Sequence, residues 1–177
     1  MKNFDINKIS KGKSRNIKIG ELSKEVIALL DLDLNPQNIN IWSTRIEEHC
    51  KKHKDEYSSP SAYNQAINSI PLILSQPDYI GLHKNGNIQY IKKLDDISLI
   101  GVQIIKGNGN LLFRTIFPIT EDKLNYSVRK GKFIPYTKNQ EILQYLLSVV
   151  RLIGGTAYPN ISFKTISGAI AACSILK

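Results

Sequence analysis

Two of the three histidines in the chain lie four residues apart in the stretch RIEEHCKKHKDEY, residues 45–57. His49 and His53 are set among lysines, a pattern that fits a metal site, an acid/base pair, a nucleic-acid contact or a solvated helix end. Histidine suits proton transfer because its unperturbed pKa, about 6.5, lets it donate and accept protons near neutrality. This stretch is therefore the first candidate for chemistry.

A zinc site is the less favoured alternative. Histidines at positions i and i+4 of a helix can both bind zinc, as in the HExxH motif. Here the intervening residues include Lys51 and Lys52 but no glutamate base, and His83 is the one remaining imidazole. No third ligand follows at a recognisable spacing, so we expect no metal and no other cofactor.

The apolar pattern around the histidines predicts one helix over residues 37–57. Ile39, Trp42 and Ile46 step by three and four residues, and the two histidines continue that stripe. The lysines of the stretch fall off it. Trp42 and Ile46 are expected to be buried, with the imidazoles at the rim of the core.

A nuclease acting on RNA needs few protein groups, because RNA supplies its own nucleophile, the 2′-hydroxyl. A base, an acid and cations around the pentavalent phosphorus are sufficient. Tyr90 and Lys92 alternate onto one face of an expected strand, and Lys93 lies on the other. Arg114 and Thr115 are expected on opposite faces of a later strand, and either one could share a cleft with the histidines.

Composition and charge favour an anionic partner. The 177 residues are 42% apolar and 22% charged, as in folded soluble proteins, and the formal net charge is +9. The charge is uneven: residues 1–24 carry a net +5, residues 25–128 a net −2 and residues 129–177 a net +6. Nucleic acid is the leading candidate partner, although the balanced middle weakens an argument from global charge.

The cysteines and apolar runs indicate a cytoplasmic protein. Cys50 and Cys173 are far apart and show no CxxC spacing, so two reduced thiols are expected. The N-terminus lacks the apolar segment of a secretory signal, and the apolar run at 168–176 is too short to span a bilayer. We therefore expect no membrane contact.

The rest of the sequence predicts helices and hairpins. Amphipathic helices are expected over residues 21–34 and about 61–75, the second kinked at its proline. Between residues 79 and 118, two Asn-Gly turns separate four alternating runs, which predicts a meander of four strands. Thr120 caps a further helix that ends by Gly131.

These elements predict an α+β fold class: N-terminal helices packed on a four-stranded antiparallel β-meander, with a helical C-terminal extension. A basic flexible arm is expected at residues 1–18, the main domain at 19–131 and the extension at 132–177. Within the extension, a strongly apolar helix over about residues 141–153 must pack on the sheet, a second subunit or a partner protein.

Five stretches occur in an order that resembles a known family: RIEEHCKKHKDEY, IPLILSQPDYIGLH, NIQYIKKLDD, LIGVQI and LLFRTIFPI. Over roughly residues 20–131 the chain is similar to the phage barnase–EndoU–colicin–RelE-like nuclease domains. Members tend to carry an HxxxH pair in the leading helix, a YIK strand and an RT or ST pair late in the sheet. This sequence departs from the pattern at Cys50, where an aliphatic residue is more usual, and its C-terminal 45 residues have no counterpart.

The resemblance implies a metal-independent endoribonuclease that leaves a 2′,3′-cyclic phosphate. His53 would be general base or acid, with His49 its partner or orienter. Lys92 and Arg114 would stabilise the charged phosphorane, and Thr115 or Tyr90 would position the phosphate. Further substrate contacts are expected from Tyr90, Lys93, Lys51 and Lys52.

The implied partner is RNA, such as tRNA or another structured RNA, cut by a phage or mobile-element toxin in the cytoplasm of the host cell. The helix at 141–153 could bind an inhibitor, as an antitoxin does, or a second copy of the chain. A different class of function also fits: a non-catalytic module that keeps the scaffold to bind nucleic acid or a host protein. Such a module would bind with a steep salt dependence and form no products.

Structural roles are open for the same residues. The histidines could be hydrogen-bonded at a helix end, where a protonated imidazole suits the helix dipole. Lys92 and Lys93 could be solvated strand charges. An arginine on a central strand needs a partner, and for Arg114 the candidates for a salt bridge are Asp95, Asp96 and Glu47.

Overall fold

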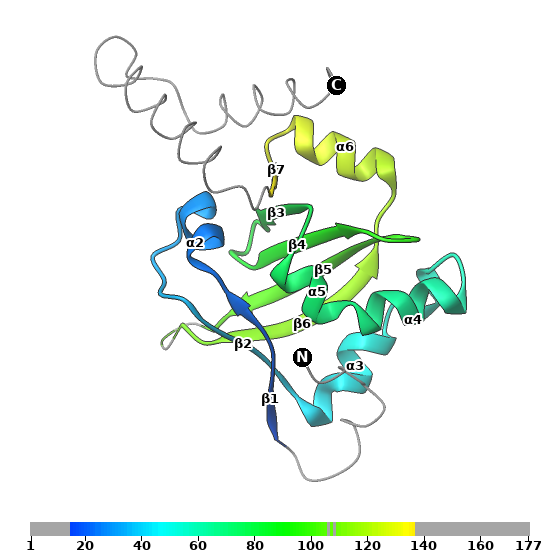
Figure 1. Ribbon diagram of the computed structural model, residues 1–177, viewed down its shortest axis with the longest axis horizontal. Helices are drawn as coiled ribbons and strands as arrows, with labels where there is room; N and C mark the ends of the chain where they lie inside the picture. Colours follow the sequence, from blue (N-terminus) through cyan, green and yellow to red (C-terminus); the bar gives the residue numbers. More distant parts are fainter. Residues whose placement is uncertain (1–14, 106, 108, 137–177) are drawn as a thin grey trace.

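The structure, a computed structural model, describes residues 15–105, 107 and 109–136, which form a seven-stranded mixed sheet flanked by helices (Figure 1). The strands are β1 (Asn16–Leu22), β2 (Gln37–Trp42), β3 (Tyr79–Leu82), β4 (Ile88–Lys93), β5 (Ile97–Ile104), β6 (Leu111–Pro118) and β7 (Phe133–Pro135). The helices are α2 (Lys24–Leu30), α3 (Ile46–Lys51), α4 (Pro60–Asn68), α5 (Ile70–Ser75) and α6 (Glu121–Arg129), with 3-10 turns η1 (Ser43–Arg45) and η2 (Lys54–Glu56). The helix expected over 141–153 lies outside the described residues.

The strand order is β1-β2-β6-β5-β4-β3-β7, and β2 pairs with β6 in parallel. The predicted fold class of N-terminal helices on a four-stranded antiparallel meander is therefore wrong. Strands β3 to β6 do form the expected meander, with antiparallel pairing between successive members. Two strands before the meander and one after it extend the sheet on both sides.

Strand β2 occupies the start of the helix predicted over residues 37–57, so that prediction is wrong. Ile39 and Ile41 alternate with asparagines, and both isoleucines are buried. This period of two is typical of a strand. The helical spacing would instead have placed Trp42 next to Ile39 on the buried face. The Trp42 side chain lies on the other face of β2 and is 43% exposed.

Strand β1 likewise takes the first residues of the helix predicted over 21–34, which leaves α2 shorter than expected. Ser23 caps α2, because its hydroxyl accepts a hydrogen bond from the Val26 N–H at 3.3 Å. The helix ends at Asp31, which has a left-handed φ of 50°. The two caps therefore limit α2 to about two turns.

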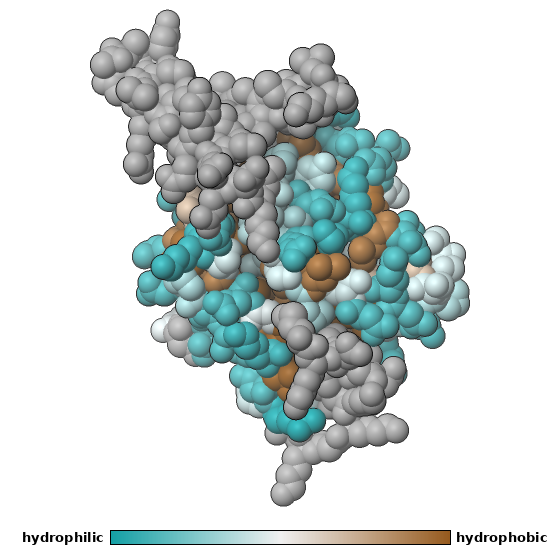
Figure 2. All heavy atoms as spheres, in the orientation of Figure 1, coloured by the Kyte–Doolittle hydropathy of each residue, from teal (hydrophilic) through white to brown (hydrophobic). Residues whose placement is uncertain are grey.

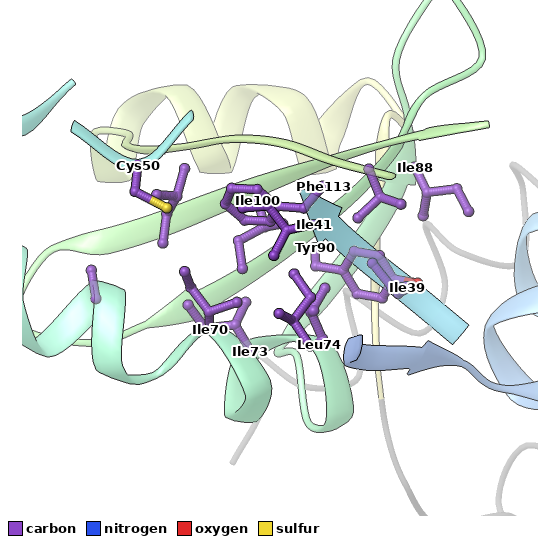
Figure 3. Close-up of a cluster of buried hydrophobic side chains, with 14 of the residues drawn as sticks. Ile39, Ile41, Cys50, Ile70, Ile73, Leu74, Ile88, Tyr90, Ile100 and Phe113 are labelled. Atoms are coloured by element: carbon purple, nitrogen blue, oxygen red, sulfur yellow. The ribbon is translucent and has the colours of Figure 1, made fainter. Parts of the chain in front are cut away.

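The sheet buries apolar side chains on both faces. Tyr90 of β4 belongs to the larger core, to which α2, α3, α4 and α5 contribute, whereas Ile91 belongs to the smaller core under α6. The alternation predicted along this strand is confirmed. Figure 3 shows the larger core, in which Ile70, Ile73 and Leu74 of α5 lie beneath the sheet residues. Full burial of each such side chain stabilises the fold by roughly 1.5–3 kcal/mol.

Helix α5 lies tightly against β1. A Cβ at Gly20 would lie 2.7 Å from the Leu74 side chain, so this approach requires a glycine. The helix predicted over 61–75 is divided at Ser69 into α4 and α5, and Pro71 occupies the first turn of α5. The proline therefore begins a new helix instead of kinking a continuous one.

Helix α6 confirms the prediction for the segment after the meander. Thr120 caps it by accepting a hydrogen bond from the Lys123 N–H at 3.2 Å, and Glu121 and Asp122 lie in its first turn. The helix stops at Arg129, just before β7. Its inner face covers the smaller core.

The described surface is largely polar on the face that Figure 2 displays, with apolar atoms in small patches between hydrophilic ones. None of the helices in the described residues is long and apolar enough for a membrane span.

Candidate active site

Strand β6 pairs with β2 only at Leu111 and Leu112, and helix α3, which carries His49, packs along the edge of β6 beyond that short ladder. The start of α3 is fixed to β1: the Ser43 N–H donates to the Arg15 carbonyl at 2.9 Å, and the Arg15 N–H donates to the Ser43 hydroxyl at 3.1 Å. Ile46 and Cys50, one turn apart, are both buried in the larger core. Because they set the rotation of α3, His49 lies beside them at the rim and is half-buried.

The second histidine is not on this helix. Helix α3 ends at Lys51, and His53 immediately precedes η2. The His53 Nδ1 lies 2.6 Å from Glu56 Oε1, and its ring centroid lies 5.3 Å from that of Phe117 on β6. Since a carboxylate only accepts, Nδ1–H donates to Glu56, which fixes the ring and leaves Nε2 as the nitrogen for proton transfer.

A β-bulge in β6 brings an arginine to the same edge. The pairing between β5 and β6 skips Arg114, since the flanking pairs are Val102–Phe113 and Gly101–Thr115. A bulge interrupts the alternation of side chains and can re-aim one of them. The side chain of Arg114 is exposed, and it lies near enough to α3 to act on the charge of His49.

Burial, and next the positive charge of Arg114, lower the pKa of His49 below its ordinary value of 6.5. The carboxylate of Glu48 acts in the opposite direction but does not reverse the shift. Glu48 itself has a lowered pKa, chiefly because Arg45 donates a hydrogen bond to it. His49 is therefore neutral at pH 7 and able to accept a proton.

The lysines of β4 are engaged elsewhere. The Lys92 Nζ donates to the Gln76 carbonyl at 2.7 Å and to Asp78 at 3.1 Å, on the side of β4 away from β6. Lys93 bonds Glu121 at 2.8 Å, and that carboxylate raises the pKa of the amine. The structure thus does not bring these two lysines together with the histidines.

The hydroxyl groups of Tyr90 and Thr115 are buried and do not reach solvent. Tyr90 is fully buried, and burial raises the pKa of its phenol. Neither its hydroxyl nor the Thr115 Oγ1 has a hydrogen-bond partner among the described residues. Lys51 and Lys52, by contrast, are exposed near the end of α3, where they could contact a polyanion.

Two of the acids considered as partners of Arg114, Asp95 and Asp96, are engaged with other groups. Asp95 accepts from the Gln65 amide at 3.1 Å, and Asp96 accepts from the Ser58 N–H at 2.7 Å.

The part of the chain that the structure describes contains no group of three or more His, Cys, Asp or Glu arranged to hold a metal ion.

An acidic cleft of about 520 Å³ adjoins the His53 end of the site. Its lining includes four carboxylates, from Glu56, Asp95, Asp96 and Glu121. This surface repels phosphate, whereas the exposed guanidinium of Arg114 at the His49 end attracts it; Arg45 at that end is paired with Glu48. A second cleft, of about 650 Å³ between α2, β3 and the α6–β7 turn, contains no histidine in its lining.

Sequence reasoning named Arg114 but missed its bulge, and it also missed Glu56 and Phe117. Glu56 follows His53 by three residues, a spacing that could have suggested the contact. The Arg114 bulge gave no local signal, because it depends on the register of β5. Phe117 reaches His53 only because α3 and η2 follow the edge of β6.

The family model described as phage-Barnase-EndoU-ColicinE5/D-RelE like nuclease3 matches residues 17–126, which is more than half of the chain. The matched region runs from β1 into α6 and includes both histidines and the bulge. It confirms the resemblance inferred from the sequence motifs. No significant match was found among curated proteins or solved structures.

Proposed function

Because the chain belongs to the phage-Barnase-EndoU-ColicinE5/D-RelE like nuclease3 family, we propose that it is a metal-independent endoribonuclease in which two histidines transfer protons. The observation that carries the proposal is the contrast between them on one edge of β6. His49 lies beside an arginine, and His53 is held by a carboxylate. The proposed substrate is RNA, such as tRNA or another structured RNA in a cell that the phage infects.

His49 is the proposed general base. Its lowered pKa keeps the ring neutral, so it can take the proton of the ribose 2′-hydroxyl. The 2′-oxygen then attacks the adjacent phosphorus, and the bond from phosphorus to the 5′-oxygen breaks. The products are a 2′,3′-cyclic phosphate and a 5′-hydroxyl end.

His53 is the proposed general acid. It gives its Nε2 proton to the departing 5′-oxygen, and the contact with Glu56 is an ion pair while the ring is protonated. Each cycle therefore moves one proton from the 2′-hydroxyl to His49 and one from His53 to the leaving group. Exchange with water restores both rings.

Arg114 is the proposed electrostatic stabiliser. Negative charge accumulates on the phosphoryl oxygens in the transition state, and a guanidinium beside them lowers the barrier. We assign Lys92 a structural role, because its contact with Asp78 ties β4 to the loop before β3. Lys51 and Lys52 are proposed to contact the flanking phosphates.

The direct experiment is incubation of end-labelled RNA with the purified protein in excess EDTA. The proposal expects fragments that end in a cyclic phosphate, and no cleavage at a linkage whose 2′-hydroxyl is replaced by hydrogen. Cleavage of that deoxy linkage, or activity that chelation abolishes, would contradict the mechanism. Tight, salt-sensitive binding without any product would instead favour the non-catalytic binding module.

A partner surface is proposed at residues 141–153 from the sequence alone, for an inhibitor or a second copy of the chain. Changing Leu146 and Val150 together to glutamate is expected to lower the sedimentation coefficient of the complex. Unchanged association would remove this proposal and leave the nuclease assignment intact.

A further inference from the structure

The single tryptophan of the chain is on the surface, next to the candidate active site. Trp42 is the last residue of β2 and is 43% exposed. The alternation of β2 sends Ile39 and Ile41 into the core and leaves Trp42 on the opposite face. An exposed indole offers a large, flat aromatic face on which a partner can stack.

Three exposed arginines are close to Trp42 in sequence or in strand register. Arg15 directly precedes Asn16, which pairs with Trp42 across the β1–β2 ladder. Arg45 follows three residues later, in η1. In the parallel ladder, Asn40 pairs with Leu112, and two residues further along each strand are Trp42 and Arg114.

An exposed indole with arginines nearby in the strand register matches the chemistry of a single-stranded nucleic acid. Each unpaired base presents a π-face that stacks on an aromatic side chain, and each adjoining phosphate is attracted by a nearby cation. Arg114 is common to this patch and to the environment of His49. The acidic cleft lies at the opposite, His53 end, so the charge favours passage of the chain over Trp42.

We propose that Trp42 is a stacking subsite for a nucleobase of single-stranded RNA, next to the phosphate that is held at Arg114. The inference deepens the proposed function and rests on it. Arg15 attracts a phosphate next to the stacked base, whereas Arg45 is paired with Glu48. The subsite requires an unpaired base, so the enzyme cuts in loops or single strands and not within a regular helix.

Because Trp42 is the sole tryptophan, its fluorescence reports the subsite directly. A short RNA carrying 2′-O-methyl groups throughout binds without being cut, since the nucleophile is blocked. We expect saturable quenching of the indole emission by this RNA, and little quenching by an abasic strand of equal length. Binding of the methylated RNA, measured by anisotropy, with unchanged emission would overturn the proposal.

Substitutions provide a second readout. Trp42→Leu should weaken RNA binding and raise KM by about tenfold, whereas Trp42→Tyr should retain most of the affinity. Tyr126→Leu is the matched control, because Tyr126 is 51% exposed and lies beside Lys130 but is on α6. Wild-type affinity in Trp42→Leu, with an unchanged melting temperature, would contradict the subsite.

The outcomes also separate this inference from the proposed function. If RNA quenches the Trp42 emission but the protein yields no cleavage product, the nuclease mechanism is removed and the stacking subsite is supported. Cleavage in EDTA by a protein whose Trp42→Leu variant has normal KM would support the mechanism and remove the subsite.

Discussion

The two ends of the β6 edge hold the same side chain in opposite surroundings. At one end His49 is half-buried beside Arg114, and both burial and the positive charge favour the neutral ring. At the other end His53 contacts a carboxylate, and the surface beyond it is acidic. The difference indicates that position in the fold, and not the four-residue spacing, gives each imidazole its chemical character.

Removal of either imidazole tests the comparison most severely. His49→Ala and His53→Ala should each lower kcat by about 10²- to 10⁴-fold, the usual contribution of a general acid or base. His83→Ala is the control, since His83 lies in the turn after β3, where it bonds Asn85 at 2.7 Å. Rates of RNA cleavage under single-turnover conditions measure the effect. Near-normal cleavage by His49→Ala or by His53→Ala would contradict the catalytic role assigned to that histidine.

Neutralisation of Arg114 should have the next largest effect. Arg114→Gln is expected to lower kcat by about 10²-fold, because a charge that stabilises the transition state is lost. It should also move the pH profile. A base must be neutral, so activity falls as the pH drops through the lowered pKa of His49. Without the cation that pKa rises, and the acidic limb shifts to higher pH.

Arg114→Lys retains the charge and is the matched control for this shift. Its acidic limb should stay close to that of the wild type, even if the bidentate contact with phosphate is lost. An acidic limb that does not move in Arg114→Gln would show that the guanidinium does not set the protonation of His49.

Loss of the carboxylate at the other end should have a smaller effect. Glu56→Gln keeps the shape of the side chain but removes the carboxylate charge that the His53 ring contacts, so kcat should fall by about tenfold with little change in KM. Asp55→Asn changes the neighbouring exposed acid and serves as the control. Equal effects of the two substitutions would point to general surface charge rather than a specific contact.

Thr115→Val should have the smallest effect. The Thr115 hydroxyl is buried without a partner among the described residues, and such a group costs roughly 1–3 kcal/mol. Its removal is expected to maintain or raise the free energy of unfolding in urea and to change kcat by less than about twofold. A loss of activity above tenfold would instead give the hydroxyl a role in positioning the phosphate.

Local patterns predicted the part of the fold that depends on neighbours in sequence. The Asn-Gly turns located the meander, and Thr120 located the start of α6. The prediction for β2 was wrong because its strand conformation depends on partners elsewhere in the chain: β1, which pairs along its whole length, and β6, about 70 residues further on. Nonlocal pairing selects the strand there, although a short local signal, the isoleucines at alternate positions, was present in the sequence.

The candidate site was predictable in its residue types and not in its contacts. The spacing of His49 and His53 suggested a shared helix face, whereas a turn separates them and gives each a different neighbour. Lys92 alternates onto the predicted face, yet Asp78 engages its amine. The bulge in β6 and the strand order place Arg114, and not Lys92, near His49. Neither feature has a local sequence signal.

The assignment of separate roles to the two histidines is tested most directly with RNA whose scissile 5′-oxygen is replaced by sulfur. A thiolate leaves without being protonated, so this substrate needs a base but no general acid. The account predicts that His53→Ala recovers most of its lost rate on this RNA and that His49→Ala does not. Equal impairment of the two variants, or recovery by His49→Ala alone, would contradict it.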